Sequence, residues 1–441
     1  MDTPHATDTA ANTATATATA AAIPAEAPTR PLQIAVVGAG PVGLALALLA
    51  AQRLPQATVC VYDSLPADHD ISRDARTLAL SLGSVQLLQQ LGLWADIAAQ
   101  AAPIRAVNVS QQQPALLGLL NPLNPLAPRR SGPAVEPQVW IRAEDEGVEQ
   151  LGAVASYGAI VQPLRAAWRA ACAAHPERCQ ARYGTPVSGL SPRPGGVEVD
   201  AQVVERHDLA VIAEGGVFAD QARKAVHRDY QQRAWVGTVT LADTPAGTAW
   251  ERFTPQGPAA LLPLPEVPGQ ASGTRRASLV WCVPSDDDPV EALSEAQRLA
   301  VLAHIFPAEV GRFVGISALK VFPLGLNAER SLVEGRTVRI GNAAQTLHPV
   351  AGQGLNLGLR DAHALLQALR GTTDVDAALA RVAWQRAPDR WALIATTDFL
   401  ARSFTWQLPG LSTLRGAGLA TLQQIPPLKS WLARRMMFGH R

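Results

Sequence analysis

The stretch that decides the fold is Ile34-Ala35-Val36-Val37-Gly38-Ala39-Gly40-Pro41-Val42-Gly43, which runs into the apolar segment Leu44 to Arg53. Its first four residues predict a short buried parallel strand, and the segment after Gly43 predicts a helix. The G-x-G-x-x-G pattern stands between them. In this context Gly38 permits the tight turn, Gly40 lets the backbone approach a pyrophosphate, and Gly43 lets helix and strand pack closely. The start of the helix then offers N–H groups to the phosphates.

A second apolar segment, Thr58 to Tyr62, predicts another strand and ends at Asp63. Asp63 lies about twenty positions after Gly43, where an acidic side chain holds the ribose hydroxyls in this type of fold. Strand, turn, helix and acid together predict dinucleotide binding. The alternative is a glycine turn in some other α/β protein, and the pattern alone does not separate NAD from FAD.

A second glycine-bearing stretch, RIGNAAQTLHPVAGQGLNLGLRD, occupies residues 339–361. We expect a short strand that ends at Gly341, then a loop, then a helix that begins near Leu355. The free N–H groups from Gly354 to Asn356 would face a partly negative ring edge. Gly352 and Gly354 would let the backbone lie flat against a planar cofactor.

This stretch resembles the flavin-contacting motif of the FAD-dependent hydroxylases of ubiquinone biosynthesis (2-polyprenyl-6-methoxyphenol hydroxylase type), which belong to the para-hydroxybenzoate hydroxylase-like group A flavoprotein monooxygenases. The family pattern GNAAQTLHPxAGQGxNLGLRD is matched almost residue for residue. The resemblance extends from about Pro31 to Gly439. Further motifs follow in the family's order: the segment around Arg76, LGLW at Leu91–Trp94, Ile141–Asp145, Glu251–Thr254, Ser278–Cys282, Thr397–Leu400 and Arg402–Phe404.

The resemblance implies FAD as the cofactor and NAD(P)H as the reductant. We expect the flavin to perform the chemistry, so no residue is assigned a catalytic role with certainty; His348 and Pro349 are expected beside the flavin. No metal is expected. The residues expected to contact the cofactor are Gly38, Gly40, Pro41, Val42, Gly43, Asp63, Arg76, Gln162, Glu214, Gly341, Asn342, Pro349, Gly352, Gln353, Gly354, Leu355 and Asn356.

Two of these positions depart from the family pattern. Glu214-Gly215 stands where the family has Asp-Gly, after the expected strand Leu209 to Ala213. The glutamate is one methylene longer, so its contacts would differ. Val161-Gln162-Pro163 stands where the family has an arginine near the start of a helix, so Gln162 would hold the pyrophosphate more weakly.

Several side chains have two interpretations. Arg76 either contacts FAD or pairs with Asp74 at the start of a helix. His348 either relays a proton near the flavin or satisfies backbone groups in its loop. Asp361 is expected to be structural, either pairing with Arg360 or capping neighbouring backbone.

The reaction implied by the resemblance is hydroxylation of a polyprenylated phenol during ubiquinone synthesis. NAD(P)H would reduce the flavin, and O2 would add to it as a flavin hydroperoxide whose distal oxygen attacks the ring. The protein would supply position and an apolar, water-excluding pocket. The rival functions are hydroxylation of another aromatic metabolite, a flavin reductase or oxidase, and a non-catalytic FAD-binding subunit of a biosynthetic complex.

The charge and the cysteine content indicate which partners and which compartment are expected. The 441 residues carry a formal net charge of +1, which argues against a nucleic-acid partner. The four cysteines form no CxxC pair, which favours a reducing, cytoplasmic compartment. Residues 391–438 predict two or three helices broken at Pro409-Gly410 and Pro426-Pro427. The last has an apolar face beside basic residues, so it either packs on its own domain or touches the inner-membrane surface or a ubiquinone-biosynthesis complex. A homo-oligomer stays open.

The expected fold is α/β, with a Rossmann-like FAD-binding domain of the para-hydroxybenzoate hydroxylase type, an inserted mixed β-sheet substrate domain and C-terminal helices. The FAD-binding domain would comprise residues 31–103, 152–223 and 330–390, and the substrate domain residues 104–151 and 224–329. The C-terminal helical region would be 391–441. Residues 1–30 are an Ala/Thr-rich tail expected to be disordered. The proline-rich insertion 113–138 would be a surface loop or a lid.

Overall fold

The G-x-G-x-x-G stretch forms a strand, a turn and a helix, as predicted. β1 (Leu32–Val37) leads into the turn, and α1 (Pro41–Arg53) begins at Pro41. The helix starts earlier than Leu44 because the fixed φ of proline suits the first helical position. β2 (Ala57–Asp63) pairs in parallel with β1, so Asp63 ends at the same sheet edge as the turn.

The structure is a computed structural model that describes residues 30–112, 136–215, 224–349, 352–403 and 411–439. The expected tail, apart from Arg30, and residues 113–135 of the proline-rich insertion lie outside the described residues. So do Val350, Ala351 and the expected helix break at Pro409-Gly410. The compact unit described below begins at Leu32.

The sheet that carries the glycine turn has six strands in the order β19-β20-β12-β1-β2-β8. Only β19 pairs antiparallel with its neighbour; the other pairs are parallel. The strands after β2 are β8 (Cys179–Tyr183), β12 (Leu209–Ile212), β19 (Val333–Glu334) and β20 (Thr337–Arg339).

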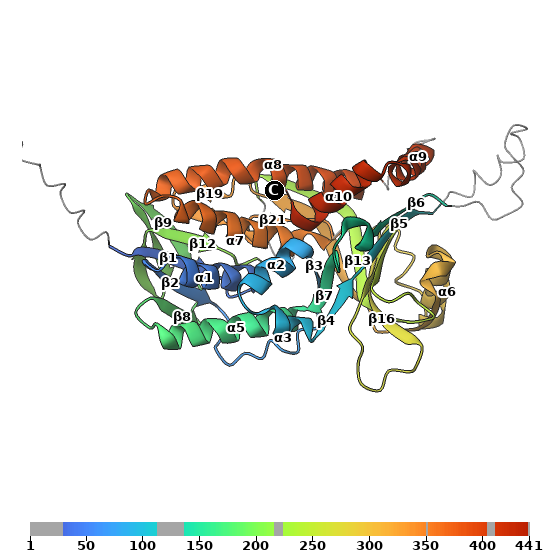
Figure 1. Cartoon of the computed structure of the whole chain (residues 1–441), viewed down its shortest axis with the longest axis horizontal. Helices are drawn as coiled ribbons and strands as arrows, with labels where there is room; N and C mark the ends of the chain where they lie inside the picture. Colours follow the sequence, from blue (N-terminus) through green and yellow to red (C-terminus); the bar gives the residue numbers. More distant parts are fainter. Residues whose placement is uncertain (1–29, 113–135, 216–223, 350–351, 404–410, 440–441) are drawn as a thin grey trace, which may run out of the picture. The chain divides into compact units, whose positions relative to one another are not determined.

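Successive side chains of β1 point to opposite faces of the sheet, and each face packs into a different hydrophobic core. Ile34 and Val36 pack with α1 and α5 (Tyr157–Ala174), whereas Ala35 faces a small antiparallel sheet. The small sheet consists of β9 (Gly189–Arg193), β10 (Gly196–Ala201) and β11 (Val203–His207). The sheet is thus a layer between helices on one face and a β-meander on the other, consistent with Figure 1.

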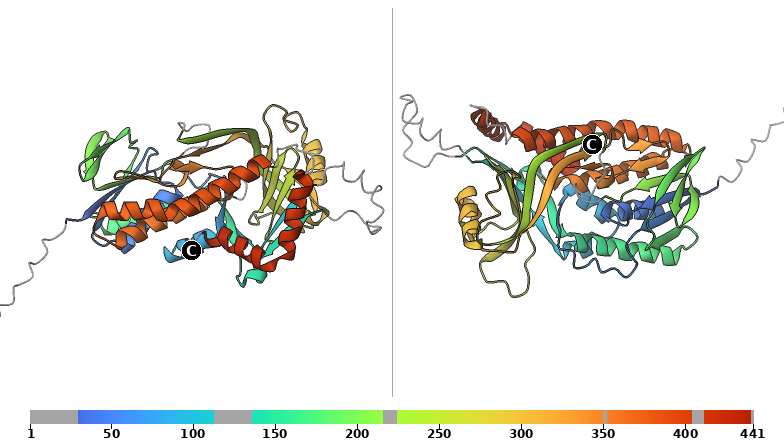
Figure 2. Two further views of the ribbon diagram at one scale, coloured as in Figure 1. Left: turned by 90° about the horizontal axis from the view of Figure 1, so that it is seen from above. Right: turned by 180° about the vertical axis from the view of Figure 1, so that it is seen from behind.

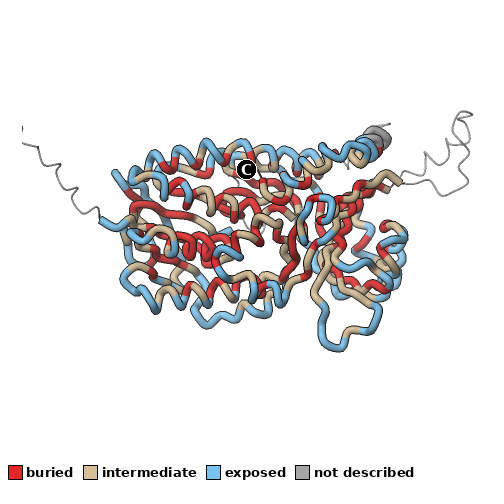
Figure 3. The backbone as a smooth tube through the Cα atoms, in the orientation of Figure 1, coloured by how far each residue is buried: buried red, intermediate tan, exposed pale blue. Residues whose placement is uncertain are grey.

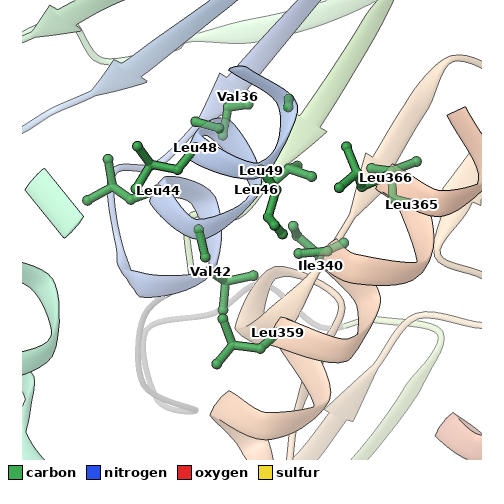
Figure 4. Packing of buried hydrophobic residues seen from close by; sticks show 14 of the residues in the cluster. Val36, Val42, Leu44, Leu46, Leu48, Leu49, Ile340, Leu359, Leu365 and Leu366 are labelled. Atoms are coloured by element: carbon green, nitrogen blue, oxygen red, sulfur yellow. The ribbon is translucent and has the colours of Figure 1, made fainter. Parts of the chain in front are cut away.

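The main core forms where α1 meets α7 (Gly354–Arg370). α1 is buried without interruption from Val42 to Ala50, so it is apolar all round, as a central helix must be. In Figure 4, Val42 of α1 lies beside Leu359 of α7, and Leu46 and Leu49 of α1 lie on the side of Leu365 and Leu366. Truncation of one such leucine costs about 2–5 kcal/mol. Packing of this core therefore fixes the second glycine-bearing stretch against the first.

The second large sheet, called the substrate sheet below, has nine strands and is mixed, as predicted for the sheet of the substrate domain. Eight strands follow the order β21-β18-β13-β16-β15-β14-β5-β6, and β17 pairs with β13; the β14–β5 pair is parallel. α6 (Glu295–Ile305) packs on one face. The strands are β5 (Ala106–Gln111), β6 (Gln138–Arg142), β13 (Val226–Ala242), β14 (Thr248–Thr254), β15 (Gly257–Pro263), β16 (Thr274–Pro284), β17 (Arg312–Ile316), β18 (Lys320–Ala328) and β21 (Gln345–Thr346).

A third, three-stranded sheet has the order β3-β7-β4. It contains β3 (Thr77–Ser81), β4 (Ala101–Ile104) and β7 (Gly152–Ser156), with α2 (Leu82–Gln90) and α3 (Trp94–Ala98) beside it. The helix start expected after Arg76 is therefore wrong: Thr77 opens a strand. Its antiparallel pairing with β7, from Thr77 to Ser81, overrides the helical interpretation. Short 3-10 turns lie at Glu144–Glu146 (η2), Ala308–Val310 (η4) and Gly341–Ala343 (η5).

Three helices close the chain: α8 (Val375–Ser403), α9 (Leu411–Gln424) and α10 (Pro426–Phe438). α8 runs alongside α7 (Figures 1 and 2). The division expected after residue 390 falls inside α8, which links the two regions without a break. Figure 3 shows buried backbone along α1 and its sheet and along the strands of the substrate sheet.

Candidate functional site

The first glycine turn is built for close backbone approach. Gly38 has φ +103°, and a Cβ there would lie 2.7 Å from the backbone nitrogen of Glu214. A Cβ on Gly43 would lie 2.0 Å from the carbonyl oxygen of Gly38. Gly40 is the N-cap of α1 and brings no side-chain cap, so the first N–H groups of the helix point at the turn. These features suit a diphosphate.

Asp63 lies at the edge where the ribose acid was predicted. Its Oδ2 accepts a hydrogen bond from the backbone N–H of Ala39 at 2.6 Å, and its Oδ1 accepts one from Leu65 at 2.8 Å. Glu214 stands near it: desolvation raises the pKa of Glu214, and the negative charge of Asp63 adds to the rise. The two acids therefore share one side of the turn.

The two glycine-bearing stretches meet, as predicted. Gly341 has φ +60° and lies in the η5 turn, and a Cβ on Gly358 would come within 2.7 Å of its Cα. The same Cβ would lie 2.8 Å from Cγ2 of Val42 in α1. A Cβ on Gly215 would lie 2.5 Å from Cβ of Asn342, so the Glu214-Gly215 segment joins the same junction.

The second loop ends at α7, which begins at Gly354, close to the predicted start. Asn356 is fully buried, and its side chain makes four hydrogen bonds. Its Oδ1 accepts from the Ser81 N–H at 2.8 Å and from Ser84 Oγ at 2.7 Å, and its Nδ2 donates to the carbonyls of Ala79 and Gly352. The protein uses the hydrogen-bonding capacity of this side chain, so the predicted contact of Asn356 with the cofactor falls to its backbone and stays a prediction. Its backbone N–H is the group left for the cofactor.

Arg76 pairs with Asp74, so one of its two interpretations describes this structure. Its guanidinium donates to the Asp74 carboxylate at 2.6–3.0 Å and stacks 4.3 Å from the ring centroid of Tyr157. The Tyr157 hydroxyl is 3.5 Å from the position of a Cβ on Gly40, which places the pair beside the phosphate turn. Contact of Arg76 with FAD stays a prediction. So does that of Gln162, an exposed residue in the second turn of α5.

His348 is buried at 2 % exposure and faces the substrate sheet. Its Nε2 lies 3.0 Å from Oε1 of Gln232 in β13, and its ring packs edge-on to Tyr230. Burial lowers the pKa of His348 to about 3, so the ring is neutral at ordinary pH. One partner of the ring is thus a side-chain amide of β13, and the predicted contact with loop backbone stays a prediction. A proton relay through a charged imidazole is disfavoured.

Asp361 is structural, as expected, but its partner is corrected. The fully buried carboxylate accepts from Arg386 Nε at 2.8 Å, while Arg360 pairs with Asp389 at 3.1 Å. Adjacent helical residues point to different faces, which excludes the expected Arg360–Asp361 pair. Arg360 also donates to Oε1 of Gln353, the N-cap of α7. This network ties α8 to the second loop.

A cavity of about 150 Å³ lies between β3, the second loop, the substrate sheet and α10. Pro349, Gly352 and Gln353 form its wall on the loop side, so the expected flavin-contacting residues face a space. The substrate-sheet side is apolar except for Glu251, which the sequence singled out only as part of a strand motif. The other lining residues include Val107, Val109, Ile141, Ala249, Ala260, Leu262, Val280, Met436 and Met437.

An apolar groove of about 510 Å³ continues from this cavity between β14, α8, α9 and α10. The two spaces share Val109, Ile141, Glu251, Gln353 and Met436. Phe399 and Trp431, which are 53 % and 55 % exposed, stand at the groove. The arrangement therefore offers a compact space beside the loop and a longer apolar extension from it.

Two kinds of site find no support in the described part of the chain. No group of three or more His, Cys, Asp or Glu side chains there is placed to hold a metal. No helix there is both long and apolar enough to cross a bilayer. The four cysteines all fall within the described ranges and are free.

Comparisons with known proteins agree with this geometry. The FAD binding domain family matches residues 31–179 and 199–394. Ubiquinone hydroxylase UbiL of Rhodospirillum rubrum is 30 % identical, with 92 % of this chain and 89 % of that protein covered. The 3-demethoxyubiquinol 3-hydroxylase of Escherichia coli is 29 % identical, with 91 % and 97 % covered.

Solved structures share the fold. HpxO of Klebsiella pneumoniae, complexed with FAD and uric acid, has a TM-score of 0.63 at 17 % identity, covering 91 % of this chain and 97 % of that one. The p-nitrophenol 4-monooxygenase PnpA of Pseudomonas putida has a TM-score of 0.66 at 15 % identity, covering 93 % and 99 %. At such identities the likeness concerns the fold alone.

Proposed function

The chain belongs to the FAD-binding family that includes the ubiquinone hydroxylases, and from that premise we propose that it hydroxylates the aromatic ring of a polyprenylated phenol in ubiquinone biosynthesis. The chain is an FAD-dependent monooxygenase. Enzymes of this class use NAD(P)H and O2, so we expect both as co-substrates here. The observation that carries the choice of substrate is the pair of connected spaces: a cavity beside the second loop and an apolar groove that leads away from it.

The shapes of the two spaces suit the two parts of such a substrate. The phenol ring would occupy the cavity, close to Pro349 and Gly352. The prenyl tail would follow the groove past Leu393, Leu422 and Leu432, where apolar burial stabilises it by about 25 cal/mol per Å². A small polar aromatic substrate would fill only the cavity and leave the groove empty.

The residues of the two loops would hold FAD. The turn at Gly38–Gly43 and the start of α1 would bind the diphosphate, and Asp63 would bind the ribose. The backbone at Pro349 and from Gly352 to Leu355 would lie against the ring system. Bound FAD would pass electrons from NAD(P)H to O2. The chain itself would orient the phenol and keep water away through the apolar walls of the cavity.

The C-terminal helices bear on how an insoluble substrate arrives. α10 packs on its own unit through the buried Ala433 and Met437, as one interpretation of its apolar face predicted. Trp431 and Phe399 nevertheless stay exposed at the groove. We place a lipid surface at this rim. A biosynthetic complex or a homo-oligomer that covers this rim are the alternatives, and either could deliver an insoluble substrate to the groove.

The test is product analysis under 18O2. The purified protein, FAD, NADPH or NADH and 2-farnesylphenol would be incubated together, and extracts analysed by mass spectrometry. We expect a catechol or hydroquinone product that carries one 18O atom. NAD(P)H oxidation without labelled product would favour a reductase or oxidase. Protein-bound FAD that NAD(P)H never reduces would favour a non-catalytic subunit. Turnover of another aromatic compound, with prenyl phenols untouched, would contradict the ubiquinone assignment.

A further inference from the structure

Glu251 lies on the cavity face of β14. On this strand Trp250, which also borders the cavity, packs in the core beneath α6, and Arg252 Nε donates to the carbonyl of Ile305 at 2.8 Å. Successive side chains alternate, so Ala249, Glu251 and Phe253 share the opposite face. The strand therefore presents a carboxylate where its neighbours are apolar.

The residues around Glu251 on the sheet are apolar. Its cross-strand partners are Ala260 on β15 and Val109 on β5, and Val280 follows on β16. The buried Cys282 thiol lies close enough to Glu251 for the carboxylate charge to affect its pKa. Burial raises its pKa, and the negative charge of Glu251 adds to the rise.

Glu251 also stands where the two spaces join. It lines the cavity and the groove, with Gln353 of the second loop on the same junction. Among the described residues that line the cavity, it is the one ionisable side chain. An ionisable group in an apolar, ligand-sized space is a candidate for function rather than for stability.

We propose that Glu251 is a catalytic residue that accepts the phenolic proton of the substrate. The inference rests on the proposed function and assigns a base to it. As the phenol O–H bond breaks toward the carboxylate, its electron pair moves into the ring and activates the ortho and para carbons. One of these carbons bonds to an oxygen atom derived from O2. The carbon then loses its hydrogen as a proton, and the ring regains aromaticity.

The atoms and electrons balance over the cycle. NAD(P)H supplies two electrons, and with one O2 and one H⁺ it yields a new ring hydroxyl, one water and NAD(P)⁺. The proton taken by Glu251 returns to the phenolic oxygen before release, so the carboxylate is regenerated. The rival role for Glu251 is structural anchoring, which requires a polar atom there but no base.

The test compares Glu251→Gln with wild type, using 2-farnesylphenol and a fluorinated 2-farnesylphenol whose phenol is more acidic. Gln preserves size and polarity but cannot take the proton. General-base catalysis contributes about 10²–10⁴-fold, so we expect product formation to fall by about 100-fold or more. NAD(P)H oxidation would continue, with hydrogen peroxide in place of product. The defect should narrow to about tenfold with the acidic phenol, and Glu251→Asp should recover part of the rate.

Controls separate the outcomes. Glu295→Gln, an exposed substitution at the start of α6, should behave as wild type. Equal product yields from Glu251→Gln and wild type would overturn the inference but not the proposed function. So would an equal loss with both phenols, or loss of bound FAD, because either assigns a structural role. A second measurement on wild type avoids any folding defect: the methyl ether of the phenol, which has no proton to give, should bind without being hydroxylated, and its hydroxylation would overturn the inference. Wild type that leaves every prenyl phenol unchanged would sink the proposed function itself.

Discussion

The junction between the two glycine-bearing stretches gives the sharpest prediction, for the substitution Gly358→Ala. The new Cβ would lie 2.7 Å from Cα of Gly341 and 2.8 Å from Cγ2 of Val42. Ordinary contact begins at 3.4 Å, so α7 must move by about 0.7 Å against backbone, which cannot rotate away. Overpacking of this kind costs about 1–3 kcal/mol, and alanine in a helix returns about 1 kcal/mol. Because the clash is with backbone, we expect the upper end, a net loss of about 2 kcal/mol.

This displacement separates the phosphate turn from the ring loop, so FAD should bind more weakly. A loss of about 1.4 kcal/mol in binding corresponds to a tenfold rise in Kd. The assay is titration of apoprotein with FAD, followed by flavin fluorescence, together with the thermal unfolding midpoint. Gly189→Ala is the matched control, since a Cβ there meets nothing within 4 Å. Wild-type FAD affinity in Gly358→Ala, combined with a higher unfolding midpoint, would refute the proposed junction.

Three further outcomes follow from the structure. Asp361→Asn should destabilise the fold by about 3 kcal/mol, the low end for a broken buried ion pair, because it removes one of the two carboxylates that pair with the buried Arg386 and leaves only Asp389. Asp376→Asn, at an exposed pair, should cost under about 1 kcal/mol. Chemical denaturation measures both losses, and similar losses would contradict the buried network. The pKa of His348 is near 3 in the folded protein, below the value of about 6.5 that a histidine has in the unfolded chain. The unfolded chain therefore takes up a proton first, and the free energy of unfolding falls as the pH drops from about 6.5 toward 3. His348→Gln should therefore lose less stability than wild type between about pH 7 and pH 5, and parallel unfolding curves would argue against a neutral buried ring. Leu422→Trp should fill the groove and raise KM for 2-farnesylphenol but not for phenols with a single prenyl unit. The control Trp384→Ala, at an exposed position on α8, should change neither KM. Equal effects on both tail lengths would show that the tail does not bind in the groove.

Much of the fold is predictable because its signals are local. The strand, turn and helix around Gly38 follow from apolar runs and glycine spacing, and α7 starts close to the predicted residue. The position of Gly358 against Val42 shows that the two stretches contact each other, and their convergence on one flavin stays a prediction. The family, the fold class and FAD as cofactor are confirmed by the comparisons.

Contacts between distant segments were missed, because one sequence does not encode them locally. The Arg386 partner of Asp361 lies 25 residues away on α8, and the Gln232 amide beside His348 lies 116 residues away on β13. The hydrogen bonds of the Asn356 side chain to β3 and α2 were likewise not predicted. Glu251 was hidden because its strand motif says nothing of which face meets a cavity. The alternation of β14 gave a signal, an acid between apolar same-face neighbours Ala249 and Phe253, but only the sheet order places that face.

The most direct test is a crystal structure of the purified protein with FAD added. The diphosphate should lie at the turn from Gly38 to Gly43, with the ring system against Pro349 and Gly352 and facing the cavity that holds Glu251. A ring system bound elsewhere would contradict the account. So would a protein that takes up no FAD even in excess.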